Sequence, residues 1–342
     1  MTSRERILTA LQRKTPDVVP TFEWFIDETV GRALTGSTDP IEIVEALDID
    51  GINIRPNYSR RAVSTEIFVD EWGATRQLTG DAIPAVLESP IKEITQHASY
   101  QFPDPAASHR FATLEKALTR FGDKRAIIFN LRDGWSDMRD LLGYENCLMA
   151  FIEEPDHFRA LIDRVVDYNL AVARAAKERF GIEIVATTDD VANARGLFLN
   201  PEQYFAVLGP GFRKVMRGYK DLGLSIIKHC DGDTTAVMDF WIDCGIDCFD
   251  PVDPTAGLRM DVFKQRYGDR ICLKGNIDCT GALCTGTPAE VRDEVRRCLA
   301  AGGPAGLILS SSNMIHHGVK AENYRAMLDA LREFGQSPER KA

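Results

Sequence analysis

The sequence lacks the features that mark membrane, secreted and nucleic-acid-binding proteins. No uninterrupted apolar run approaches the ~18 residues that span a bilayer, and residues 1–6 lead into an amphipathic pattern instead of an apolar signal segment. Lys and Arg form no cluster, and the formal net charge of -10 disfavours nucleic acid and anionic membranes as partners. We therefore expect a cytoplasmic protein without a membrane or nucleic-acid partner.

Paired cysteines and common nucleotide-binding motifs are also missing. The eight cysteines are scattered and form no CxxC pair, so we expect reduced thiols and no disulfide framework. Most lie in apolar surroundings, where Cys acts as a small buried hydrophobe, and only Cys230 follows a predicted strand beside polar residues. No P-loop, dinucleotide fingerprint or covalent-nucleophile motif occurs, which argues against those enzyme classes.

Short apolar runs alternate with longer helical patterns along almost the whole chain. This alternation is typical of parallel βα units, and the 342 residues are enough for a large core. The predicted helices between the strands include 156–180, 201–220, 234–244, 288–301 and 321–334. Eight runs have strand character: 18–24, 51–54, 126–130, 183–188, 224–229, 245–250, 271–275 and 306–310. Because eight such units close a ring, we predict an α/β fold of the (β/α)8 TIM-barrel type, as a single domain over 1–342.

Two additions to a minimal barrel are predicted. Residues 3–13 form an extra N-terminal helix, which could close the bottom of the barrel. Residues 56–110 are too many for a simple connection after the second strand. Within them, 66–76 has the pattern of a β-hairpin or an extended lid. We place this insertion over the catalytic mouth, although a surface excursion without a function fits the pattern as well.

The segment 226–233, with the sequence IIKHCDGD, carries the main candidate site. Side chains alternate faces along a strand, so His229 and Asp231 should point to one side and Cys230 to the other. An imidazole and a carboxyl on one face can act as an acid/base pair or bind a metal ion. The alternative is a structural His that hydrogen-bonds to a nearby carbonyl group.

Barrel enzymes place their working residues at the carboxyl ends of the strands. Acidic side chains outnumber basic ones at these ends here, and so many carboxylates must be protonated, paired with Arg or neutralised by a cation. A metal ion or a cationic substrate would meet that need. The polar residues at the strand ends are Glu23, Trp24, Asn53, Arg55, Asn130, Arg132, Asp133, Asp189, Asp190, His229, Asp231, Asp250, Asp253, Asn276, Asp278, residues 310–313 and His316.

Several stretches resemble the uroporphyrinogen decarboxylase superfamily. The resemblance implies a (β/α)8 barrel, and one of two activities: decarboxylation of a tetrapyrrole, or corrinoid-dependent methyl transfer from methanol, methylamines, methoxylated aromatics or methylated carriers. Barrels of this superfamily are often dimers, so a homodimer is possible. The stretches that carry the resemblance are 188–190, 200–204, 245–250, 267–278, 286–291 and 322–327.

The region of the first strand departs from the decarboxylase pattern. The resemblance implies an Arg-rich segment of the type RQAGR there, which binds the acidic side chains of the macrocycle. This chain has PTFEWFID over 20–27, whose acids would repel such a substrate. An FSDI-like motif is also missing, although Asp50 lies near the equivalent region. These departures favour the methyltransferase branch.

The fifth predicted strand is closer to the methyltransferases, which carry a His-x-Cys zinc pair there. Here Asp231 stands at the second ligand position and Cys230 lies between it and His229. The third Cys ligand of that branch aligns with 310–314, which contains Ser and Asn instead. Oxygen is a harder donor than thiolate, so zinc held by His229 and Asp231 would be a different site from the usual one.

We therefore expect a methyltransferase that moves a methyl group between a small O- or N-methylated substrate and a corrinoid held by a partner protein. The alternatives are a decarboxylase in which Arg55, Arg132 and Arg195 hold carboxylates, and a non-catalytic corrinoid or tetrapyrrole binder. In the methyltransferase hypothesis, His229, Asp231 and Asp190 are catalytic. The substrate would contact Glu23, Trp24, Asn130, Arg132 and Asn276.

Overall fold

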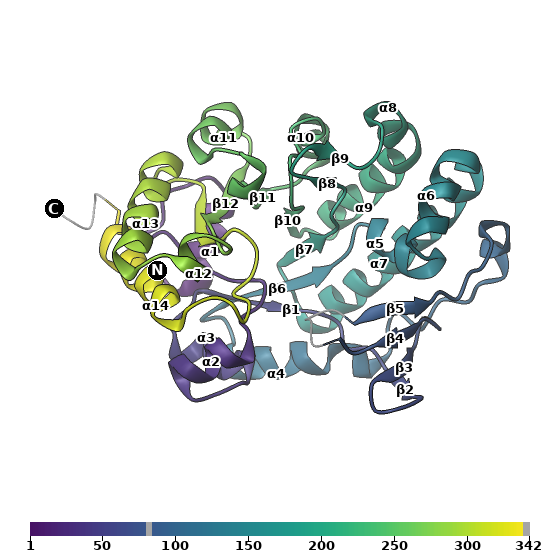
Figure 1. The fold of residues 1–342 in the computed structure, drawn as a ribbon, viewed down its shortest axis with the longest axis horizontal. Helices are drawn as coiled ribbons and strands as arrows, with labels where there is room; N and C mark the ends of the chain where they lie inside the picture. The colour runs from purple at the N-terminus through teal and green to yellow at the C-terminus, as the bar shows by residue number, and fades with distance from the viewer. Residues whose placement is uncertain (80–83, 338–342) are drawn as a thin grey trace.

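Seven parallel strands form one curved sheet in the computed structural model, which describes residues 1–79 and 84–337 (Figure 1). Every neighbouring pair in this sheet is parallel. The strands in spatial order are β1 (Gly51–Ile54), β6 (Ala126–Leu131), β7 (Ile184–Thr188), β10 (Ser225–His229), β11 (Cys248–Asp250), β12 (Cys272–Ile277) and β13 (Leu307–Ser311). This curved parallel sheet confirms the TIM-like barrel class.

An irregular extended segment lies between β13 and β1. Pro20 accepts a backbone hydrogen bond from Leu309 in β13 at 2.9 Å, and Thr21 accepts one from Asp50, just before β1, at 3.0 Å. The expectation of a regular strand over 18–24 was wrong, because Pro20 has no N–H and the Thr21 N–H donates to the Asp50 side chain. The segment nevertheless occupies the eighth position of the ring.

Helices cover the outside of the sheet (Figure 1). Three of the predicted helices, over 156–180, 288–301 and 321–334, are confirmed within a residue or two, and so is the N-terminal one. The helix predicted over 201–220 is divided into α8, a π-helical turn (Tyr204–Leu208) and α9, and that over 234–244 is shortened to α10. The helices are α1 (Ser3–Leu11), α2 (Glu28–Thr35), α3 (Pro40–Ala46), α4 (Ala112–Phe121), α5 (Trp135–Leu142), α6 (Tyr144–Glu153), α7 (Pro155–Phe180), α8 (Pro201–Gln203), α9 (Gly209–Asp221), α10 (Met238–Cys244), α11 (Met260–Tyr267), α12 (Ala282–Thr285), α13 (Pro288–Gly302) and α14 (Ala321–Phe334).

Local sequence sets the ends of the longest helices. Thr287 caps α13 in a capping box with Glu290, and Pro288 occupies the first turn, where a missing N–H costs nothing. Gly181 ends α7 in the left-handed conformation, which glycine adopts without strain. None of the helices within the described residues combines the length and apolar character needed to cross a bilayer.

The insertion after β1 is a four-stranded antiparallel sheet. The predicted hairpin over 66–76 is confirmed as β3 and β4, and two further strands extend it. Asp70 organises the turn between β3 and β4, because its side chain accepts from the N–H groups of Trp72 and Ala74. Residues 80–83 of the insertion lie outside the described residues. The strands are β2 (Arg60–Ala62), β3 (Ile67–Asp70), β4 (Thr75–Gln77) and β5 (Ala85–Glu88), paired in chain order.

This small sheet is anchored at the side of the barrel near α5 and α7. Arg76 of β4 forms an ion pair with Asp140 of α5 at 2.7 Å, and Trp72 packs against Tyr168 of α7 with ring centroids 4.7 Å apart. No hydrogen bond or ion pair joins the described part of the sheet to His229. An insertion is therefore confirmed, whereas a lid over the catalytic mouth stays a prediction.

Candidate active site

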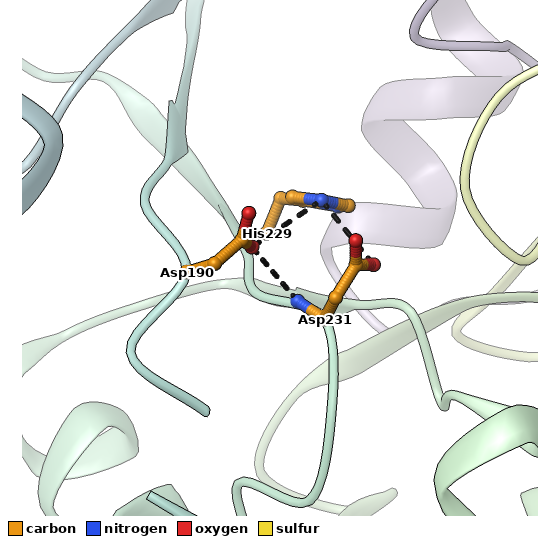
Figure 2. Close-up of side chains that lie close together, drawn as sticks. All are labelled: Asp190, His229 and Asp231. Atoms are coloured by element: carbon orange, nitrogen blue, oxygen red, sulfur yellow. Dashed lines mark hydrogen bonds and ion pairs between the residues drawn. The ribbon is translucent and has the colours of Figure 1, made fainter. Parts of the chain in front are cut away.

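His229 ends β10 and faces two carboxylates at the mouth of the barrel. Its Nε2 atom lies 3.6 Å from Asp231 Oδ1 and 3.8 Å from Asp190 Oδ1. The backbone N–H of Asp231 donates to Asp190 Oδ1 at 2.9 Å, so the two acidic residues are also tied to each other (Figure 2). The structure thus brings together the three residues that the sequence analysis proposed as catalytic.

Asp250, at the end of β11, holds His229 from the other side. His229 Nδ1 lies 2.6 Å from Asp250 Oδ2, and the Trp24 indole N–H donates to the same oxygen. Lys274 of β12 donates to Asp250 Oδ1 at 2.7 Å, and both members of this ion pair are fully buried. Asp250 therefore accepts from three donors. It holds the His229 imidazole beside the Trp24 indole in an edge-to-face arrangement.

The charges of these neighbours decide which nitrogen of His229 carries a proton. Burial alone would raise the pKa of Asp250, but Lys274 and His229 together hold that pKa below its ordinary value. Asp250 is then an ionised acceptor, so the Nδ1–H group of His229 donates a hydrogen bond to it and keeps its proton. Nε2 is consequently the nitrogen that faces Asp190 and Asp231, free to accept a proton or bind a cation.

Asp231 is a carboxyl group whose protonation changes close to neutral pH. Burial and the negative charge of Asp190 raise its pKa to about 6, although His229 opposes the shift. Its second oxygen accepts from the Asn313 side-chain amide, which holds the carboxyl in place. Burial lowers the pKa of His229, but the charges of Asp231 and Asp250 raise it by more, so this pKa lies above its ordinary value.

The donor set at this site fits a divalent cation. One ligand atom from each of Asp190, His229 and Asp231 lies within 4.8 Å of the other two. Hydrogen bonding of Nδ1 to a carboxylate is also the usual support for a His ligand. Cys230 is not part of this set, because its thiol is buried on the opposite face and accepts from the Val191 N–H at 3.3 Å. Two oxygens and one nitrogen form a harder set than a His-x-Cys pair.

Two predicted substrate contacts, Asn130 and Asn276, are buried and incompletely bonded. Asn130 of β6 accepts from Thr188 Oγ1 at 3.0 Å, and its Nδ2 has no partner within the described residues. Asn276 of β12 is 1% exposed, and its Oδ1 also lacks a partner there. A buried polar atom without a partner costs about 1–3 kcal/mol, so both atoms suit contact with a ligand.

Glu23 is placed differently from its neighbour Trp24. Both of its carboxyl oxygens accept from Ser311, from the N–H at 3.1 Å and from the hydroxyl at 2.6 Å. Burial raises the pKa of Glu23 to about 7 despite the opposing charge of Lys274. Because successive residues of an extended segment point to opposite faces, Trp24 contacts Asp250 while Glu23 contacts β13. A substrate contact by Glu23 stays a prediction.

Several acidic residues near the mouth have structural partners instead of a shared cation. Asp189 accepts from the N–H groups of residues 133, 134 and 136 and so caps the first turn of α5. Asp133 forms a buried ion pair with Lys228 at 2.6 Å. Arg132 is also paired, since its Nη1 lies 3.1 Å from Asp137 and 2.9 Å from Asp140. Backbone N–H groups, Lys228 and Arg132 thus compensate part of the negative charge of these carboxylates.

Sequence reasoning missed the two buried lysines of the site, Lys228 and Lys274. Lys228 and Lys274 are fully buried within strands, and each lies in an otherwise apolar run, IIKH or CLKG. A lysine at a position where a strand should be buried on both faces is the signal that could have revealed them, because a buried ammonium group needs a carboxylate partner.

Gly232 makes the turn that positions Asp231. Its φ is +92°, and a Cβ atom there would lie 2.7 Å from the backbone of Asn193. We expect Gly232→Ala to lower the free energy of unfolding by about 3 kcal/mol, from backbone strain and steric overlap together. Gly257→Ala is the matched control, because Gly257 has φ +77° but open space around it, and should cost only about 1–2 kcal/mol. Equal losses in urea unfolding of the two variants would contradict this explanation.

Comparison with known proteins identifies the family. The profile of the family described as "Uroporphyrinogen decarboxylase (URO-D)" matches residues 67–334. The chain belongs to the URO-D family. Its relatives include a methylated-thiol–coenzyme M methyltransferase of Methanosarcina mazei, 25% identical over 193 residues, which cover 56% of this chain and 49% of that protein. A uroporphyrinogen decarboxylase of Alkalilimnicola ehrlichii is 22% identical over 273 residues, or 73% of this chain and 69% of that protein.

A solved structure supports the fold over nearly the whole chain. A methyltransferase from Methanosarcina mazei superimposes with a TM-score of 0.76 at 17% identity, and the match covers 98% of this chain and 99% of that one. The likeness at this identity establishes the shared barrel. The matched stretch spans only about half of the methylated-thiol methyltransferase named above. The relatives of this chain include both methyltransferases and decarboxylases.

Proposed function

We propose that this chain is a methyltransferase that moves a methyl group between a small O- or N-methylated substrate and a corrinoid held by a partner protein. The observation that carries the proposal is the cluster of Asp190, His229 and Asp231, with His229 Nε2 directed to both carboxylates at the mouth. The likeness to methyltransferases in sequence and fold supports it. Cytoplasmic location and a homodimer belong to the same proposal.

His229 would manage the proton of the leaving group. When a methyl group leaves an oxygen or nitrogen atom, that atom keeps the bonding electron pair and needs a proton. His229 Nε2, protonated while Asp231 and Asp250 balance its charge, can deliver that proton, and it can withdraw one in the reverse direction. Asp250 and Trp24 orient the imidazole, which aligns the reacting atoms along one axis.

A divalent cation, with zinc as the first candidate, would be held by His229, Asp231 and Asp190. Because Nε2 cannot bind an ion and deliver a proton at the same time, the ion is the alternative to the proton route, and it would act as a Lewis acid at the heteroatom that carries the methyl group. The substrate end of the mouth would be formed by Trp24, whose indole can face a cationic or aromatic group. Asn130 and Asn276 each offer an unpartnered polar atom to the substrate.

The activity is tested with chemically reduced cobalamin and a panel of small methoxylated aromatics and methylamines. Methylcobalamin formation, followed by its absorption spectrum, is the expected result. In that reaction the methyl–heteroatom bond breaks, the methyl–cobalt bond forms and the heteroatom gains a proton. Release of CO2 from uroporphyrinogen without methylcobalamin formation would instead support the decarboxylase alternative. Binding of cobalamin without either reaction would support a non-catalytic binder.

Zinc binding is a separate prediction. We expect equilibrium dialysis to show one zinc ion per chain, and Asp231→Asn to weaken this binding about 10-fold or more because the amide carries no charge. Asp221→Asn is the matched control, since Asp221 lies on the exposed end of α9. Unchanged zinc affinity in Asp231→Asn would remove Asp231 from the ligand set.

A further inference from the structure

We infer that the mouth contains a second subsite, formed by Arg55, Asn130 and Arg132, which binds an anionic oxygen group of the substrate. Its ligand would be a carboxylate, sulfonate or phosphate at one end of a small molecule. The inference rests on the proposed function only in placing the reacting end of that molecule at His229. It thereby limits the substrates to small methylated acids.

The register of the barrel strands places these residues side by side. β1 and β6 are parallel, with Ile54 opposite Phe129. The next residues along these strands, Arg55 and Asn130, therefore also lie opposite each other. Asn130 bonds to Thr188, which lies opposite His229 in the neighbouring pair. Because side chains two residues apart share a face, Arg132 continues the face of Asn130.

The three residues offer hydrogen-bond donors that no acceptor uses. Arg55 is exposed, and its side chain has no hydrogen bond or ion pair within the described residues. The Nδ2 of Asn130 is buried and unpartnered there. Arg132 directs only Nη1 to Asp137 and Asp140, which leaves its Nε and Nη2 donors. Donors without an acceptor at neighbouring strand ends are complementary to an oxyanion.

The electrostatics of the subsite also favour an anion. Partial burial of its guanidinium group and the nearby charge of Arg132 both lower the pKa of Arg55, so the two guanidinium groups repel each other at the neighbouring ends of β1 and β6. Asp137 and Asp140 neutralise Arg132 from the side of α5, and no carboxylate pairs with Arg55 within the described residues. A bound anion would relieve this repulsion, as an Arg–carboxylate pair does elsewhere.

The spacing of the strands limits the size of the ligand. β1 and β10 are three steps apart in the sheet, about 14 Å along the wall at the usual strand spacing, and the straight line across the curved mouth is shorter. A single-ring acid with a methylated heteroatom is of suitable length to reach from Arg55 towards His229. This subsite would bind one anionic group, whereas a polyanionic macrocycle would bring several.

The test measures binding of benzoate and benzenesulfonate to the whole protein by calorimetry at constant ionic strength, with no corrinoid present. We expect binding by the wild type and a loss of about 10-fold or more in Arg55→Met, because a charge-assisted contact is removed. Asn130→Asp should weaken binding at least as much by repelling the anion. Arg174→Met is the matched control, since Arg174 is exposed on α7, and its affinity should equal that of the wild type.

Three results would overturn the inference: no binding by the wild type, equal binding by Arg55→Met, or benzamide binding as tightly as benzoate. Arg55→Met should fold normally because Arg55 has no partner to lose within the described residues, and its thermal unfolding checks this. The assay involves no turnover. Loss of the anion site would therefore leave methyl transfer untested, whereas anion binding by a protein without methyl transfer would reject only the proposed function.

Discussion

Replacing His229 by Ala is expected to lower kcat/KM for methyl transfer by about 10²–10⁴-fold, the usual contribution of a general acid or base. The variant loses the only imidazole among the described residues that lies between Asp190 and Asp231. Methylcobalamin formation from reduced cobalamin and the best substrate of the panel measures the effect. His317→Ala is the control, because His317 is exposed on the loop after β13 and should retain full activity.

The His229→Ala variant should still fold. Asp250 keeps its hydrogen bonds from Lys274 and Trp24, so the buried carboxylate remains compensated. Circular dichroism and urea unfolding separate a catalytic defect from a folding defect. Full methyl transfer by a folded His229→Ala protein would reject the proposed catalytic centre.

Lys274→Met is expected to lower the free energy of unfolding by about 3–5 kcal/mol, the typical cost of removing one partner of a buried ion pair. Both charged groups of the pair are fully buried and 2.7 Å apart, so the change would leave Asp250 underneutralised in a medium of low dielectric constant. Urea unfolding measures the loss. Lys220→Met provides the comparison, because the Lys220–Asp247 pair is partly exposed and should cost only about 0–1 kcal/mol.

A double variant separates the stability role of Lys274 from its effect on the site. Adding Asp250→Asn to Lys274→Met removes the uncompensated charge and should restore part of the lost stability. Activity should stay low, because an amide no longer holds His229 Nδ1 as an ionised carboxylate does. If Lys274→Met destabilised the protein no more than Lys220→Met, the ion pair would not be a major stabilising contact.

Much of the architecture was predictable because its signals are local. The two-residue period of a strand predicts that His229 and Asp231 share a face and that Cys230 points away, and the structure has this arrangement. Helix caps such as Thr287 and Gly181 mark ends that depend on only a few neighbouring residues. The alternation of strands and helices likewise needs no knowledge of distant contacts.

Long-range pairing limited the rest of the prediction. Whether 18–24 becomes a regular strand depends on Asp50, whose carboxylate takes the N–H of Thr21. Asp189 and Asp190 are adjacent in sequence, yet the first caps α5 and the second faces His229. No local pattern distinguishes two such neighbours, since their partners come from other strands.

The sequence by itself therefore determined the kind of barrel and the face on which the imidazole and its nearest carboxyl lie, because backbone periodicity sets these properties within a few residues. Its motifs separately carried the resemblance to the URO-D family. Only the tertiary structure decided that Asp250, Lys274 and Trp24 support His229, and that Arg55 is left without a partner among the described residues. Those relations depend on which strand ends meet at the mouth, and closure of the ring brings together residues that are far apart in the chain.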